Sequence, residues 1–145
     1  MRLPSVGKYT KFNGRRKPEM LEPGTFSVEN YNEADTVVAD WKAISDKADA
    51  IYAKLPANAR DAFYQLVLHP TKACAVVNEL YAAVAKNRFY ASRGDTRANE
   101  FAQRARELFK QDADLTDYFN HKLAGGKWNH MMDQTHIGYT YWQQP

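Results

Sequence analysis

Cysteine and long apolar runs are scarce in this sequence of 145 residues, and each scarcity excludes a class of protein. The single cysteine, Cys74, rules out an internal disulfide. Its neighbours are alanines and valines, which predict a small buried apolar side chain rather than a reactive thiol. No apolar run approaches the roughly 20 residues that span a bilayer, so we expect no membrane partner. Residues 1–4 are not followed by an apolar segment, so no signal peptide is expected within this chain.

The net charge is small but unevenly distributed. The formal charge is +3, of which residues 1–22 carry +4 and the remainder −1. A basic arm of this kind is one way to bind phosphates. This arm also holds Tyr9 and Phe12, so we interpret it as a segment that packs against a neighbouring domain, and nucleic acid is not an expected partner. Its basic residues are Arg2, Lys8, Lys11, Arg15, Arg16 and Lys17.

Apolar residues at alternating spacings of three and four predict a long first helix. Asn30 is expected to cap this helix, Glu33 to complete a capping box, and Pro56 to end it. A helix of about 25 residues is roughly 37 Å long, so only a long partner can cover its apolar stripe. The stripe contains Tyr31, Ala34, Val37, Val38, Trp41, Ile44, Ser45, Ala48, Ile51, Tyr52 and Leu55.

The same spacing predicts two further helical regions. One begins near Asn58 and ends near Ala91, with a break or bend expected at Pro70, which has no N–H to donate. The other begins near Thr96, with an interruption expected at Asp112, and stops at a pair of glycines.

These regions predict an all-α fold, an antiparallel helical bundle of three to five helices with extended N- and C-terminal arms. No segment has the alternating period of a strand. Residues 1–26 are expected to form a connector arm and residues 27–126 the bundle. Residues 127–145 are expected to form an aromatic C-terminal arm packed on the bundle or at an interface.

The acidic residues do not suggest a catalytic pair, which glycoside hydrolysis usually requires. Most lie on polar helix faces, as Asp46 does four residues after Lys42, and only Asp133 lies in the aromatic arm. We therefore assign no catalytic residue. On a helix, His130 and His136 would be rotated by about 240° from each other, so with Asp133 they form no metal site unless an irregular turn joins them. No metal and no other cofactor is expected.

The C-terminal arm combines large rings with short polar side chains and has almost no formal charge. Such a segment can pack on its own bundle, contact a neighbouring domain or subunit, or stack on a sugar. Ile137 and two methionines favour burial, so docking or an interface is our interpretation, with sugar contact as the alternative. The candidate contact residues are Trp128, His130, Asp133, His136, Tyr139, Tyr141 and Trp142.

Three runs of this sequence resemble glycoside hydrolase family 115, the xylan α-1,2-glucuronidases. They are residues 128–145 (WNHMMDQTHIGYTYWQQP), residues 9–19 (YTKFNGRRKPE) and residues 62–67 (AFYQLV). The resemblance extends over nearly the whole chain. In that family a catalytic (β/α)8 barrel precedes a helical bundle, and the three runs match the exit from the barrel and the bundle itself.

The resemblance implies a parent enzyme that hydrolyses the bond between (4-O-methyl)glucuronic acid and xylan with inversion. The barrel is not in this chain, so we expect a non-catalytic domain and a reading frame that continues on both sides. Its implied partners are the neighbouring barrel, a second copy in a homodimer and, through the parent, a xylan-type polysaccharide. A secreted or periplasmic parent is compatible with the family, and the localisation stays open. The alternative is a free-standing helical interaction or carbohydrate-contact module.

Overall fold

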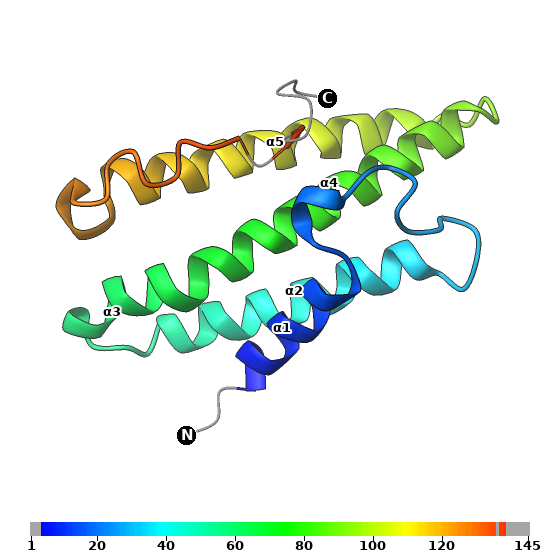
Figure 1. Ribbon diagram of the computed structural model, residues 1–145. Helices are drawn as coiled ribbons and strands as arrows, with labels where there is room; N and C mark the ends of the chain where they lie inside the picture. The colour runs from blue at the N-terminus through cyan, green and yellow to red at the C-terminus, as the bar shows by residue number, and fades with distance from the viewer. Residues whose placement is uncertain (1–3, 136, 139–145) are drawn as a thin grey trace.

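Three long helices lie side by side in one layer (Figure 1). The computed structural model describes residues 4–135 and 137–138. Helix α4 (His69–Ala91) lies between α2 (Glu33–Tyr52) and α5 (Arg97–His121) and runs antiparallel to both. The fold confirms the predicted all-α antiparallel bundle. No helix among the described residues has the length and apolarity that crossing a membrane requires.

The N-terminal arm differs from the expected extended connector, because Pro4–Arg15 forms helix α1, followed by a 3-10 turn η1 at Pro18–Met20. The rings of Tyr9 and Phe12 meet Trp41 of α2 edge-on, with centroids 5.9 and 5.6 Å apart. Trp41 is only 2% exposed. Burial against α2 thus outweighs the weak helix propensity of this glycine-containing segment. Arg15 bonds Asp40 of α2 at 2.8 Å, so this part of the basic arm packs on its own chain.

Helix α2 begins later than expected, and the capping box from Asn30 is not formed. The residue before the helix is Asn32, which has a left-handed backbone and makes no side-chain cap. The Glu33 carboxylate instead accepts a hydrogen bond from the backbone N–H of Ser27 at 2.8 Å. Tyr31, expected on the buried stripe, is 99% exposed. The centre of the stripe is buried as predicted, at Ala34, Val37, Trp41, Ile44 and Ala48.

Just before Pro70, where a break or bend was expected, the structure has a π-helical turn. Helix α3 (Ala57–Phe63) continues through the turn η2 (Tyr64–Leu68) directly into α4. At the end of this turn the His69 N–H donates to the carbonyl of Tyr64, five residues earlier. The Thr71 hydroxyl donates to the carbonyl of Val67 at 2.7 Å. The wider turn therefore accommodates a proline that cannot donate, and the helix continues beyond it.

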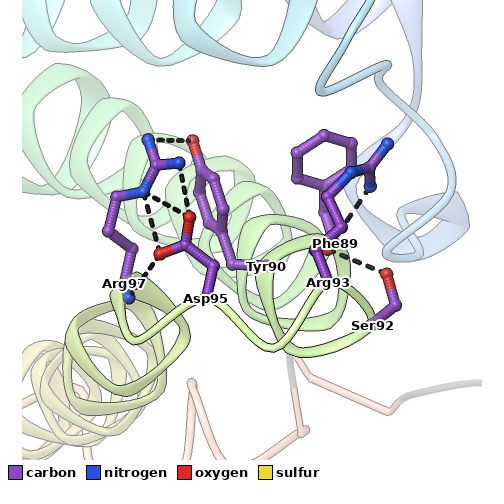
Figure 2. Close-up of polar contacts among 6 residues, drawn as sticks. All are labelled: Phe89, Tyr90, Ser92, Arg93, Asp95 and Arg97. Atoms are coloured by element: carbon purple, nitrogen blue, oxygen red, sulfur yellow. Dashed lines mark hydrogen bonds and ion pairs between the residues drawn. The ribbon is translucent and has the colours of Figure 1, made fainter.

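The turn from α4 to α5 is held by arginines that lie on aromatic rings. Figure 2 shows Arg97 facing both the carboxylate of Asp95 and the hydroxyl of Tyr90, with its guanidinium 4.1 Å from the Tyr90 ring centre. Arg93 lies 3.6 Å from the centre of the Phe89 ring. Hydrogen bonds from the Arg97 side chain and backbone lower the pKa of Asp95 to about 2. This turn closes the end of the layer opposite α3.

Helix α5 runs without the interruption expected at Asp112, which is buried within it. The core of the described residues contains three apolar clusters. One joins α4 to α5, one joins α1 to α2, and one lies where α2, the π turn and the end of α5 meet. Their most buried members are Leu80, Leu108 and Ile137 in the first, Trp41 and Ile44 in the second, and Ala48, Leu68, Phe119 and Leu123 in the third.

Candidate functional site

The C-terminal segment reverses direction after α5 and runs back along that helix (Figure 1). The reversal is made by the 3-10 turn η3 (Leu123–Gly126), in which Ala124, Gly125 and Gly126 all have positive φ angles. A Cβ at Gly126 would lie 3.1 Å from the carbonyl oxygen of His121. Glycine at this position therefore permits both the backbone conformation and the close approach to the end of α5.

A buried asparagine fixes the returning segment to α5. Asn120 is 3% exposed. Its Nδ2 donates to Oδ1 of Asp133 at 2.8 Å, and its Oδ1 accepts from the backbone N–H of Met132 at 2.9 Å. Both the donor and the acceptor of the Asn120 amide are therefore used. Two bonds to successive residues fix the position of the segment along α5.

His130 completes this cluster from the solvent side. Its Nδ1 lies 2.7 Å from Oδ2 of Asp133, and an ionised carboxylate only accepts, so this nitrogen is the donor. The His130 side chain is 78% exposed and its backbone φ is 65°. Both oxygens of Asp133 thus accept hydrogen bonds from the chain itself. We call Asn120, His130 and Asp133 the Asn120 clamp.

Apolar side chains attach the same segment to the bundle. Trp128 and Met132 pack against the cluster around Phe119, and Ile137, 2% exposed, belongs to the cluster between α4 and α5. Lys127 lies 4.9 Å from the centre of the Trp128 ring. The described part of the C-terminal arm therefore packs on its own bundle.

The structure brings together only part of the predicted contact set. Trp128, His130 and Asp133 lie on the returning segment as described above. The other candidates lie outside the described residues, and they are His136, Tyr139, Tyr141 and Trp142. Of the three residues considered as metal ligands, the structure therefore describes only the pair His130 and Asp133. Within residues 4–135 and 137–138, no three potential ligands are grouped to hold a metal ion.

A pocket of about 470 Å3 with a mixed polar and apolar lining lies between α5 and the returning segment. Asp133 borders it together with a second carboxylate–histidine pair, Asp117 and His121, whose nearest atoms are 2.9 Å apart. Hydrogen bonds from His121 and then Lys122 lower the pKa of Asp117. A general acid for glycoside hydrolysis needs a raised pKa, so Asp117 has the opposite character. Asp117 is therefore not suited to act as the acid catalyst of such a reaction.

Sequence reasoning identified Asp133 but missed Asn120, Asp117 and His121. A signal was present for Asn120, since it follows Phe119 on the side of the helix that the apolar pattern predicts to be buried. Asp117 and His121 are four residues apart, a spacing that places them on one face of a helix. The pairing of Asn120 with residues after the η3 reversal had no local signal.

A second, more apolar groove of about 430 Å3 runs between η1, α4 and the returning segment. Met131 on its border is 59% exposed, and Met20, next in the chain after the groove residue Glu19, is 50% exposed. We call this feature the methionine groove. Its other lining residues are Pro18, Ala73, Cys74, Val77, Met132, Gln134 and Thr135.

Cys74 lies beneath this groove and has the predicted buried character. It is 8% exposed, and its Sγ is 3.8 Å from the hydroxyl of Tyr9. Burial raises the pKa of the Cys74 thiol, and burial followed by the neighbouring Cys74 raises that of Tyr9 to about 12. A thiol with a raised pKa is a poor nucleophile at neutral pH. The pair is therefore structural.

No family model matches this sequence, and no curated protein matches it either.

Proposed function

We propose that this chain is a non-catalytic helical domain of a glycoside hydrolase resembling the xylan α-1,2-glucuronidases. The parent would remove (4-O-methyl)glucuronic acid from glucuronoxylan in a preceding barrel, and this domain would brace that barrel or join two subunits. The resemblance of residues 9–19, 62–67 and 128–145 supports the family. The observation that carries the structural role is the Asn120 clamp, in which both oxygens of Asp133 are used to fix the C-terminal segment.

A structural role is also supported by how the other carboxylates are used. Several of those on the helices form ion pairs with neighbouring basic groups. Asp46 pairs with Lys42 at 2.8 Å as expected from their spacing, and Lys72 bonds Asp49 at 2.9 Å. Glycosidases place two carboxyl groups about 5–9.5 Å apart around the scissile bond. Groups already neutralised by internal ion pairs are poorly suited to that role.

The surface that we assign to the barrel is the methionine groove. Two of its lining residues, Pro18 and Glu19, come from the arm that would lead out of the barrel in the parent. Met131 on its border is exposed, as is Met20 next to the lining residue Glu19, and both side chains are unbranched and adapt their shape to a partner. A groove continuous with the linker to a neighbouring domain is the surface that such a domain reaches at the lowest cost in chain entropy.

Activity of the isolated chain tests the non-catalytic part of this proposal. The chain is incubated with 4-O-methylglucuronoxylan, and released uronic acid is measured. We expect no release. Turnover that disappears in Asp133→Asn would place the chemistry in this chain and overturn the proposal, because it would make the clamp carboxylate catalytic.

Binding to the barrel tests the bracing role. The separately produced barrel of the parent is mixed with the chain, and complex formation is followed by light scattering. Met131→Glu should weaken the complex by at least tenfold, because it puts a charge into an apolar contact. Leu66→Glu is the matched control, since Leu66 is 74% exposed on the π turn, and it should bind as the unchanged chain does. Binding only to a second copy would assign the groove to a homodimer, and no binding of either kind would favour the free-standing module.

A further inference from the structure

A separate cavity of about 750 Å3 opens at the junction of α1 and α2. It lies between the end of α1, the loop before α2 and the first turns of α2, and no residue of the described part of the C-terminal segment lines it. Its volume falls within the roughly 300–1,000 Å3 of ligand pockets. The residues that matter for the argument are Arg15, Arg16, Glu22, Phe26, Asn30 and Tyr31.

Tyr31 stands at this cavity with its side chain 99% exposed. A single exposed ring is ordinary on a protein surface. This ring, however, is on a residue with φ of 57°, followed by Asn32 with φ of 50°. Left-handed backbone at non-glycine residues costs free energy. Because the ring is exposed, no burial of apolar surface offsets that cost. The combination of backbone strain and full exposure indicates a ring that is positioned to contact a ligand.

The loop that displays Tyr31 is internally bonded. Ser27 is the centre of this order: its N–H donates to Glu33 Oε2 at 2.8 Å, and its hydroxyl accepts from the N–H of Asn30 at 2.9 Å. Its carbonyl accepts from the N–H of Ala34 at 3.0 Å. The backbone that carries the ring is therefore held by the loop before any ligand arrives, which lowers the entropic cost of binding.

The polar groups of the cavity are balanced in charge and partly uncommitted. Arg15 is held by Asp40 at 2.8 Å. Arg16 uses only Nε, which donates to the carbonyl of Met20 at 3.0 Å. Within the described residues, the terminal nitrogens of Arg16 and the side chains of Glu22 and Asn30 make no hydrogen bond. Two arginines and two glutamates, Glu22 and Glu33, line the cavity, so it favours a neutral ligand with many hydroxyls over an anion.

We propose that this cavity binds a neutral sugar unit of a polysaccharide chain, with Tyr31 as the stacking surface. The apolar face of the sugar would lie on the ring, and its hydroxyls would bond Arg16, Glu22 and Asn30. The choice of xylan as the polysaccharide rests on the proposed function. The site would hold the unsubstituted backbone of the chain, away from the barrel that removes its uronic acid.

Calorimetric titration of the 145-residue chain with neutral xylo-oligosaccharides tests this inference. The unchanged chain should bind, and Tyr31→Ala should weaken binding about tenfold, the upper end of what one aromatic contact contributes. Tyr31→Phe keeps the ring and should bind as the unchanged chain does. Asn30→Ala removes one polar group without touching the backbone bonds of the loop and should also weaken binding. Leu66→Ala, which removes another exposed apolar side chain far along the sequence, is the control and should change nothing.

Tyr31→Gly separates binding from folding. Glycine adopts φ near 60° without strain, so this variant should melt at the same temperature as the unchanged chain or higher, while binding falls as in Tyr31→Ala. Absence of binding by the unchanged chain, or equal binding by Tyr31→Ala, would overturn the inference. A change of oligomeric state in Tyr31→Ala would overturn it too, because the ring would then belong to a protein contact. If the chain still binds the barrel through Met131 but binds no xylo-oligosaccharide, only this inference fails.

Discussion

The most informative single substitution in this molecule is Asn120→Ala, because one buried amide holds the C-terminal segment by two hydrogen bonds. Removal of the amide leaves the backbone N–H of Met132 without its partner and takes one donor from Asp133. An unsatisfied buried group costs about 1–3 kcal/mol, whereas Asp133, with a side chain 54% exposed, can turn to water. We therefore expect a loss of about 2 kcal/mol in the free energy of unfolding.

Urea denaturation measures this loss, and limited proteolysis shows where it acts. A domain of this size shifts its melting temperature by roughly 3–4 °C for each kcal/mol, so the expected shift is about 7 °C. Cleavage between residues 127 and 135 should become faster, because the segment is released from α5. Gln134→Ala is the control, since it removes an exposed amide from the same segment. A loss below about 0.5 kcal/mol with unchanged cleavage would refute the clamp.

Asn120→Asp adds a pH readout to the same position. The oxygen that accepts from Met132 is kept, but the new carboxyl lies buried beside Asp133, which raises its pKa in the folded state above that of the unfolded chain, about 3.9. A carboxyl with a raised folded pKa is tolerated while protonated, and stability falls as the pH rises through the unfolded value. The variant should therefore be closest to the unchanged protein below pH 4 and weakest near neutrality.

Three further predictions concern the core and its tyrosines. Trp41→Ala should cost about 3–5 kcal/mol in urea denaturation, because the ring is 2% exposed and joins α1 to α2, and a loss below about 1 kcal/mol would contradict this packing. Ile137→Ala should lower the free energy of unfolding by about 2–4 kcal/mol, because its side chain belongs to the core. An unchanged melting temperature would show that this side chain does not contribute to the core. Burial raises the pKa of Tyr9 and of Tyr64 to about 12 from 10, so the unfolded chain ionises first and stability should fall between pH 10 and 12. Tyr64→Phe should reduce that slope in melts across this range, and an unchanged slope would show that Tyr64 does not cause it.

The parts of the fold that follow from local pattern could be read from the sequence. The alternating spacing predicted the buried centre of α2, because helices α4 and α1 pack along the middle of that stripe. The start of α2 and the helix α1 could not be read this way. Helix α1 depends on contacts of Tyr9 and Phe12 with Trp41, about 30 residues away, and these outweigh the propensity of the segment.

Pro70 shows a different limit of sequence reasoning. Its missing N–H and its steric demand are certain, and a break or bend follows from them. The chain instead widens one turn ahead of the proline, so that His69 donates to Tyr64 and Thr71 covers the carbonyl of Val67. The sequence contains the residues that make this possible, but their choice of partners is decided by the packing of Tyr64 and Leu68 in the core.

The candidate site could be predicted only in part, because its residues are brought together by contacts between segments distant in sequence. Asp133 was predicted as a contact residue of the C-terminal arm, and the structure shows it bonded to Asn120 and His130. The partner on α5 could not be identified, because the reversal at Gly125 and Gly126 sets the register between the two segments. An asparagine beside Phe119 was the available signal, since a polar residue on a buried face requires a partner.

The clamp and the methionine groove are physically coupled through Met132. Its backbone N–H is bonded to Asn120, and its side chain packs on the core while bordering the groove. A bond that fixes the backbone of Met132 also fixes the wall of the groove next to Met131. Loss of Asn120 would therefore change the shape of the surface that we assign to the barrel, and a partner that binds the preformed groove would in turn stabilise the clamp.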